Sequence, residues 1–146
     1  KIAAIAPVSG PFQGIPEQCQ PSRAVPIMHF HGIADTFAPY TGGSPACEPV
    51  ANEQIRSVDD TIAIWKEKNG CTEEKTITYS SGDATCESYS TCREDSTITL
   101  CTIQDGGPTW PGGNSYFFPA CDPGKVSTDI SANEEMWEFF AAHPQK

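Results

Sequence analysis

The chain alternates between short apolar runs and polar loops, a pattern that predicts strands and helices of ordinary length. Residues 2–8 and 24–32 are continuous apolar runs, which are typical of strands covered on both faces of a sheet. Residues 75–80 and 96–104 alternate in period two and are rich in Thr and Ile, so each predicts a further strand.

A first amphipathic helix is predicted after residue 57. Val58, Ile62 and Trp65 recur on one helical face, which would pack onto the sheet. Ser57 is the expected N-cap, and Gly70 is the expected stop, because glycine adopts the left-handed conformation that ends many helices.

A second helix is predicted near the end of the chain. Ser131 and Glu134 form a capping box, and the helix should end before Pro144. Four large apolar residues are expected to face a core: Met136, Trp137, Phe139 and Phe140.

The predicted order is strand, strand, helix, strand, strand, helix, which indicates an open α/β sheet with helices on its faces. In such sheets the chemistry lies beyond the carboxyl ends of the strands. Two loops are expected there, residues 31–40 with the sequence HGIADTFAPY and residues 105–113 with the sequence DGGPTWPGG.

Composition narrows the class of protein. The 146 residues suit a single domain, and 19 acidic against 9 basic side chains give a net charge of −10. That charge repels phosphate backbones and anionic lipids, so nucleic acid and membrane surfaces are poor partners. A neutral or cationic ligand is favoured.

The chain has seven cysteines but no C-x-x-C motif, the spacing typical of a structural metal site. The cysteines are therefore expected to form disulfides, which indicates an extracellular location. The odd number leaves one cysteine without a partner inside the chain. The expected pairs are Cys86 with Cys92, whose loop is short, and Cys71 with Cys101.

The apolar run at residues 2–8 has neither the architecture of a signal peptide nor the length of a membrane span. This favours a fold that begins upstream of the sequence.

Six blocks follow one another in the order found in one group of secreted α/β-hydrolases: IAAIAPVSG, VPIMHFHGIADTFAPY, TIAIWKEKNGC, TITLCTI, GGPTWPGG and TDISANEEMWEFF. The chain therefore resembles the polyhydroxybutyrate depolymerase, feruloyl esterase and acetylxylan esterase family, from Lys1 to about His143. The resemblance implies one partial domain over residues 1–146. This would be the C-terminal half of an α/β-hydrolase fold, a mostly parallel sheet with flanking helices, braced by disulfides.

The family uses a Ser-His-Asp triad, with the serine on a G-x-S-x-G elbow. The resemblance places the acid at Asp35 and the histidine at Pro108, which has no imidazole. The elbow itself is absent from this sequence, and Ser9 lacks the leading glycine of that motif. We therefore expect the isolated chain to be inactive by the triad route.

The histidines offer other interpretations. His29 and His31 share one face of their strand, and with Asp35 they could form a metal site. A buried strand instead favours histidines bonded to backbone carbonyls, so neither a metal nor another cofactor is expected. His143 ends the last helix, where a surface role is expected.

Aromatic residues of the two loops are the candidate substrate-binding groups, chiefly Tyr40 and Trp110. The others are Tyr116, Phe117 and Phe118. In a related esterase they would hold a neutral carbohydrate or a phenolic ester. Equally, they could form a lid over the sheet edge.

Three functions stay open from the sequence. The chain could be part of a secreted carboxylic-ester hydrolase, a non-catalytic descendant that binds a carbohydrate, a phenolic ester or a protein, or an extracellular structural module. An open sheet edge at residues 2–8 predicts a homo-oligomer or pairing with an N-terminal half.

Overall fold

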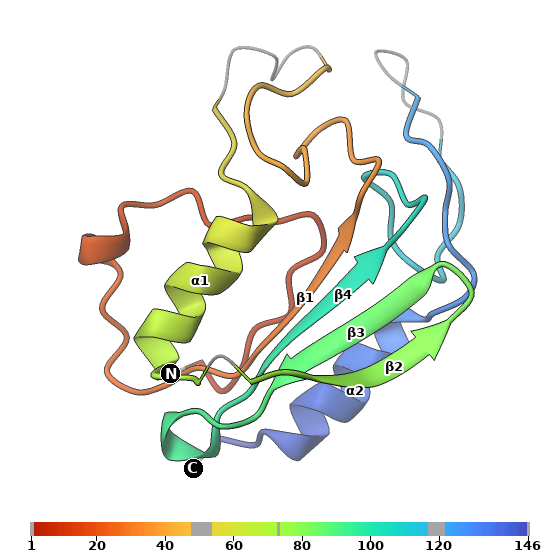
Figure 1. The fold of residues 1–146 in the computed structure, drawn as a ribbon. Coiled ribbons are helices and arrows are strands. Elements are labelled where there is room, and N and C mark those ends of the chain that lie inside the picture. The colour runs from red at the N-terminus through yellow and green to blue at the C-terminus, as the bar shows by residue number, and fades with distance from the viewer. Residues whose placement is uncertain (1, 48–53, 73, 117–121, 146) are drawn as a thin grey trace.

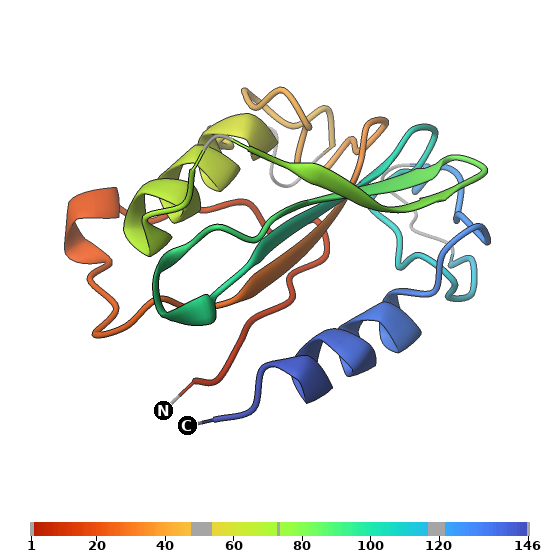
Figure 2. The same cartoon turned by 60° about the horizontal axis from the view of Figure 1, so that its bottom comes forward.

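A computed structural model gives the fold of the chain and describes residues 2–47, 54–72, 74–116 and 122–145. A four-stranded sheet carries one helix on each face (Figures 1 and 2). In chain order the elements are the 3-10 turn η1 (Pro16–Gln18), β1 (Ile27–Gly32), α1 (Val58–Asn69), β2 (Thr76–Ser81), β3 (Ala84–Tyr89), the 3-10 turn η2 (Arg93–Asp95), β4 (Ile98–Ile103) and α2 (Ala132–Ala142). Neither helix of this described part is long and apolar enough to cross a membrane.

The sheet is mixed, with the strand order β1-β4-β3-β2. β1 and β4 are parallel, whereas β3 runs antiparallel to both of its neighbours. The expectation of a mostly parallel sheet is therefore wrong. The short connections between β2, β3 and β4 explain this, because a short turn can join only antiparallel strands.

Residues 2–8 run alongside β1 but form only two isolated parallel bridges, Ile5 with Ile27 and Val8 with Phe30. Three backbone hydrogen bonds of 3.0 Å hold the segment: Met28 N–H donates to the Ile5 carbonyl, Phe30 N–H to the Pro7 carbonyl, and Ile5 N–H to the Pro26 carbonyl. Pro7 has no N–H to donate, which weakens a regular ladder. The predicted continuous strand is thus a looser parallel edge.

The caps of α1 confirm the sequence prediction. The Ser57 side chain accepts a hydrogen bond of 3.0 Å from the Asp60 N–H, and Gly70 ends the helix at a φ of 61°. Val58 and Ile62 are buried against the sheet.

The prediction for α2 is half right. Ser131 caps the helix by accepting from the Glu134 N–H, and Met136 and Phe139 are buried. Trp137 is 76% exposed and Phe140 is 41% exposed, so the expectation that they face the core is wrong. Only one helical face can contact the sheet, and these two residues lie off it.

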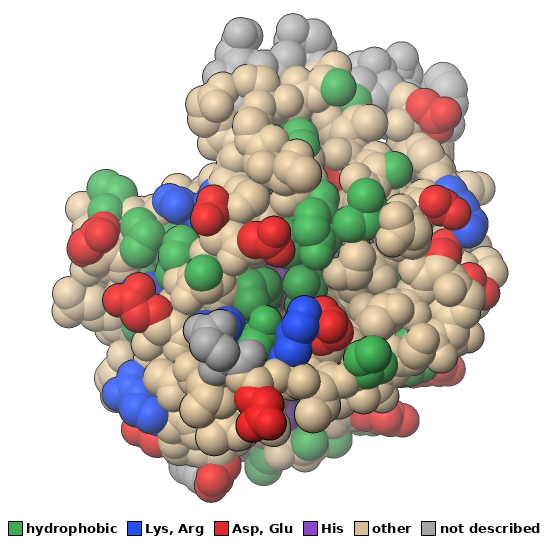
Figure 3. All heavy atoms as spheres, viewed as in Figure 1, with side chains coloured by type: hydrophobic (Ala, Val, Ile, Leu, Met, Phe, Trp, Pro, Cys, Tyr) green, Lys and Arg blue, Asp and Glu red, His purple; other side chains and the backbone are tan. Residues whose placement is uncertain are grey.

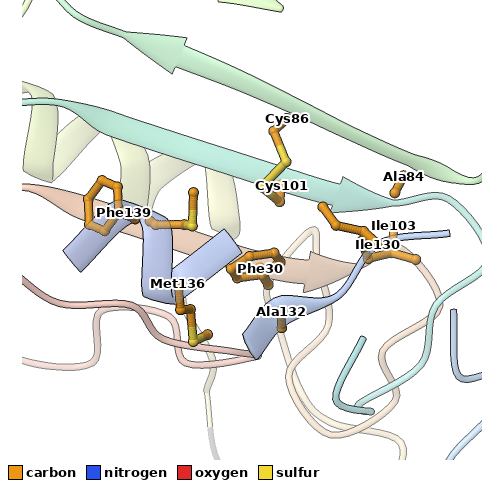
Figure 4. Close-up of a cluster of buried hydrophobic side chains, with 10 residues drawn as sticks. Phe30, Ala84, Cys86, Cys101, Ile103, Ile130, Ala132, Met136 and Phe139 are labelled. Carbon is orange, nitrogen blue, oxygen red and sulfur yellow. A yellow bond between two sulfur atoms is a disulfide. The ribbon is translucent and has the colours of Figure 1, made fainter. Parts of the chain in front are cut away.

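The larger apolar core lies between α2 and the sheet (Figure 4). Its strand residues alternate with those on the opposite face, as the period of a β-strand requires. The buried members are Met28, Phe30, Ala84, Cys86, Cys101, Ile103, Ile130, Ala132, Met136 and Phe139. A smaller cluster beneath α1 contains Val58, Ile62, Ile98 and Leu100.

Two disulfides are described, Cys71–Cys92 and Cys86–Cys101. Both predicted pairings, Cys86 with Cys92 and Cys71 with Cys101, are therefore wrong. Cys86 and Cys101 stand directly opposite each other in the register of β3 and β4, a neighbour relation that sequence spacing does not reveal.

The remaining cysteines differ in state. Cys47 is also disulfide-bonded, and Cys19 is free. Cys121 lies outside the described residues.

Candidate functional site at the carboxyl edge of the parallel strands

The loops that follow β1 and β4 meet at one edge of the sheet, because these two strands are parallel. Backbone hydrogen bonds join them directly. Ile33 N–H donates to the Ile103 carbonyl at 2.9 Å, and Ala34 N–H donates to the Gly106 carbonyl at 3.0 Å. The two loops with candidate chemistry therefore form one connected backbone structure.

Gly32 makes this contact possible. A Cβ atom at position 32 would lie 2.0 Å from the Gly106 carbonyl oxygen, a distance that no side chain can occupy. The next residue of the second loop, Gly107, is equally tight against the Pro123 carbonyl oxygen. Glycines in the sequence GxxD after β1 and in GGP after β4 thus bring the loops together.

Asp35 is the central acid of this edge and is only 5% exposed. Its Oδ1 accepts hydrogen bonds of 2.8 Å from the backbone N–H groups of Phe37 and Ala38. Its Oδ2 is buried and has no hydrogen-bond partner within the described part of the chain. One oxygen is thus fixed by the loop, while the other can accept a further donor.

His31 supports the same loop from β1. Its Nε2 lies 2.7 Å from the Ala38 carbonyl oxygen, which can only accept, so Nε2 carries the proton. Its Nδ1 then accepts from His29 Nε2 at 2.9 Å. The Asp35 Oδ2 lies 3.5 Å from His31 Nε2, whose proton already points to Ala38.

Burial keeps both histidines neutral. Desolvation, and then the nearby His31, lower the pKa of His29 from 6.5 to about 3. Desolvation also lowers the pKa of His31, although the Ala38 carbonyl and Asp35 act in the opposite direction. Each ring is 1% exposed, so neither can reach a bound substrate. Their role in this geometry is to hold the loop that carries Asp35.

Pro108 lies partly buried in the loop after β4. Its carbonyl accepts a hydrogen bond from the Tyr116 hydroxyl, and the next residue, Thr109, bonds through its side chain to the Lys125 carbonyl at 3.0 Å. The proline offers no side-chain donor or acceptor. Position 108 therefore helps to shape the loop and supplies no proton-transfer group.

Ser9 ends the edge segment with an unusual backbone. Its φ is 51°, uncommon for a non-glycine residue, and its hydroxyl is buried without a hydrogen-bond partner among the described residues. A nucleophilic serine needs a base within hydrogen-bond reach. None of the described residues therefore supplies the base that would activate Ser9.

The candidate binding residues Tyr40 and Trp110 lie toward opposite faces of the sheet. Tyr40 packs against the cluster beneath α1, and its ring meets His31 edge-on with centroids 5.7 Å apart. Trp110 is 42% exposed, and its indole N–H donates to Asn133 of α2 at 3.0 Å. Phe117 and Phe118 lie outside the described residues.

Two further findings concern the histidines. No group of three or more His, Cys, Asp or Glu side chains that could hold a metal ion occurs among the described residues. His143 is not a free surface residue, because its ring bonds to the Phe139 carbonyl at 2.8 Å and contacts Thr97 at 3.2 Å.

A pocket beside Tyr40 was missed by sequence reasoning. Its walls include Lys75, Glu87 and Tyr89, which come from β3 and the approach to β2. The sequence ATCESY of β3 alternates small and polar residues, a weak strand pattern that sequence reasoning did not recognise.

Comparison with known proteins points to esterases. No protein-family model matches the chain. The chain is 30% identical over 90 residues to "Feruloyl esterase B" of Piromyces equi, and 27% identical over 150 residues to "Putative esterase NocK" of Nocardia uniformis subsp. tsuyamanensis. The alignments cover 62% and 94% of this chain but 16% and 43% of the two relatives, so the chain spans less than half the length of each. The similarity to esterases is distant and partial.

Proposed function

We propose that the chain is the C-terminal half of a secreted α/β-hydrolase domain that acts on carboxylic esters of the polyester, feruloyl or acetylxylan type. The distant similarity to two esterases supports this proposal. So does the arrangement of a helix on each face of the sheet, with two joined loops at the carboxyl end of its parallel strands.

The environment of Asp35 is the observation that carries the proposal. A triad acid must be buried, held in one orientation, and able to accept the Nδ1 proton of the catalytic histidine. Asp35 has one oxygen fixed by two backbone N–H groups and a second oxygen without a partner in the described part of the chain. In this proposal Oδ2 is the acceptor for an imidazole.

The other two triad members have no counterpart here. The sequence contains no G-x-S-x-G elbow, and Pro108 stands where the resemblance places the histidine. His31 does not substitute, because it is buried and both of its nitrogens are bonded. The isolated chain is therefore proposed to be inactive toward esters, with the nucleophile supplied by an upstream half.

A non-catalytic binding module is the alternative, and Pro108 favours it. A lineage that had abandoned triad chemistry could keep the sheet and lose the imidazole. The two proposals differ in whether the Asp35 site regains activity when the missing groups are restored.

The same proposal accounts for location and partners. Disulfides favour an extracellular protein. The backbone groups of Ala4 and Ala6 make no hydrogen bond within the described part of the chain, which leaves one side of residues 2–8 open to a further strand. Pairing there with an N-terminal half or a second copy is expected, and a monodisperse monomer in light scattering would contradict it.

The test is a two-by-two comparison with methyl ferulate and nitrophenyl acetate as substrates. The unmodified chain and its Pro108→His variant are each assayed alone and as chimeras with the N-terminal half of a related esterase. Hydrolysis is expected only in the chimera that carries the histidine.

Asp35→Asn in that chimera provides the control, and it should reduce the rate by about 10⁴-fold. Circular dichroism verifies that each chimera folds. Ester hydrolysis by the isolated unmodified chain that disappears on Asp35→Ala would overturn the proposed inactivity.

A further inference from the structure

The pocket beside Tyr40 is a hollow on the α1 face of the sheet, between α1 and the β2–β3 hairpin. Its volume is about 290 Å³. Figure 3 shows hydrophobic side chains at its base, with basic and acidic side chains beside them. The hollow exists because α1 packs over the β1 side of the sheet and leaves the same face of β3 without a helix (Figure 1).

The floor of this hollow is apolar. Leu100 of β4 and Ile62 of α1 belong to the buried cluster beneath α1. Tyr40 forms a wall whose hydroxyl lies 3.1 Å from the Thr102 hydroxyl and whose ring packs edge-on against His31. A planar apolar ligand face could rest here without rearrangement of these side chains.

The opposite wall is also aromatic. The Lys66 ammonium lies 4.3 Å from the centre of the Tyr89 ring, which holds both side chains in place. Two further residues that line the hollow, Lys75 and Glu87, form an ion pair of 2.6 Å that is partly exposed. The walls thus offer ammonium donors and a carboxylate acceptor close to aromatic rings.

Among the described residues that line the hollow, positive and negative side chains are equal in number. Lys66 and Lys75 oppose Asp59 and Glu87, although the whole chain carries a net charge of −10. An anion would meet two carboxylates and a cation would meet two ammonium groups. The favoured ligand is therefore uncharged and rich in groups that both donate and accept hydrogen bonds.

We propose that this hollow binds one ring of a neutral sugar. The apolar face of the sugar would rest on the floor and the tyrosines, and its hydroxyls would bond to Lys75 and Glu87. The volume of about 290 Å³ lies just below the range of about 300–1,000 Å³ for sites that hold drug-sized ligands, which suits a single ring. The site uses neither Asp35 nor Pro108, so the inference goes beyond the proposed ester hydrolysis and stands apart from it.

The experiment is a titration of the isotope-labelled chain with xylobiose and with cellobiose, followed by amide chemical shifts in NMR spectra. Saturable shifts are expected for Lys75, Glu87 and Tyr89. Glu87→Gln keeps the shape of the side chain and removes its charge, so it should weaken binding about tenfold, the loss expected for one hydrogen bond to a charged group. Tyr89→Ala should abolish binding.

Trp137→Ala is the matched control, because Trp137 is an aromatic residue of α2, on the other face of the sheet, and is 76% exposed. Its affinity for both sugars should equal that of the unmodified chain. Thermal unfolding curves verify that each variant folds. If Tyr89→Ala fails to fold, the affinity of Glu87→Gln still tests the proposal.

Three results would overturn the proposal. They are an absence of saturable shifts with both disaccharides, binding that Glu87→Gln leaves unchanged, and occupation of the hollow by methyl ferulate in place of sugar. Ester hydrolysis by the same isolated samples would contradict the proposed inactivity and would leave the sugar-binding proposal unaffected.

Discussion

The two faces of the sheet are built from alternate residues of the same strands, yet they differ in chemistry. The α2 face buries Met28 and Phe30 of β1 in an almost wholly apolar cluster. The α1 face buries His29 and His31 of the same strand, bonded to each other and to the loop that carries Asp35. Neighbouring residues of β1 therefore face a packing surface on one side of the sheet and a polar network on the other.

The difference shows how the fold separates stability from site geometry. Apolar burial under α2 is non-directional and tolerates any well-packed shape, so it stabilises the sheet without fixing individual atoms. Buried polar groups on the α1 face must each find a partner, which fixes ring orientation and loop position. The candidate acid is therefore positioned from one face while the other face supplies most of the apolar burial.

Among the variants considered, Phe30→Ala should lower the free energy of unfolding the most. Phe30 is fully buried in the α2 cluster, so its loss should lower the free energy of unfolding by about 3–5 kcal/mol. Urea denaturation measures the change. Trp137→Ala, at an exposed site on α2, should change stability by less than about 0.5 kcal/mol. Equal effects of the two changes would show that the α2 face is not the main packing surface.

The two disulfides belong to different faces and offer the next comparison. Cys86–Cys101 lies in the α2 cluster, and replacing both residues by Ala should cost about 3 kcal/mol, as expected for a crosslink over about 15 residues. Cys71–Cys92 borders the α1 cluster and is only partly buried. Its loop of 21 residues makes a similar entropic contribution, so its removal should cost less only because no buried cavity is left behind. Thermal unfolding of both double variants decides the order.

The side chain of Asn69 in α1 forms hydrogen bonds to the backbone of Val25, and its replacement tests how much these bonds stabilise the fold. Its amide spans Val25, accepting from the N–H at 3.1 Å and donating to the carbonyl at 2.8 Å. Asn69→Ala should lower stability by about 1–3 kcal/mol, because both backbone groups lose their partner. Hydrogen exchange should show faster exchange of the Val25 amide. Unchanged protection of this amide would argue against the bridge.

The smallest effect concerns acid sensitivity of the α1 face. The pKa of His29 is about 3 in the folded chain and 6.5 as its ordinary value, so below pH 6.5 the unfolded chain binds a proton that the folded chain does not. Stability should therefore fall as pH decreases from 6.5 toward 3. His29→Gln should remove about 1 kcal/mol of the loss between about pH 7 and 5.5. Parallel pH curves for the two proteins, measured by urea denaturation, would contradict the neutral buried histidine.

Local signals made the helices and three of the strands predictable. Ser57 and Gly70 define the ends of α1 because capping depends on residues adjacent in sequence. β3 was missed because its buried positions are Ala84, Cys86 and Ser88, which carry little hydrophobic signal. That strand decides both the mixed sheet and the pairing of Cys86 with Cys101, so one weak signal produced two errors.

The candidate site was predictable in position but not in detail. The family resemblance assigned the acid to Asp35, which stays a prediction, and strand order placed its loop beside the loop of Pro108. The backbone bonds to Asp35 Oδ1, and an Oδ2 without a partner in the described part of the chain, arise from loop geometry that the sequence does not encode locally. The sugar-sized hollow depends on Tyr40 and Glu87, which are far apart in the chain and meet only through tertiary packing.

For protein engineering, the close contact between Gly32 and the Gly106 carbonyl means that the loops after β1 and β4 must be exchanged as a pair. A loop grafted after β1 from another protein would arrive without the backbone shape that its neighbour was built to fit, so the two loops must be transplanted together. A library for new activity should hold both glycines constant and vary the residues beyond Thr109. Side-chain diversity would then be sampled on a backbone frame that does not shift between variants.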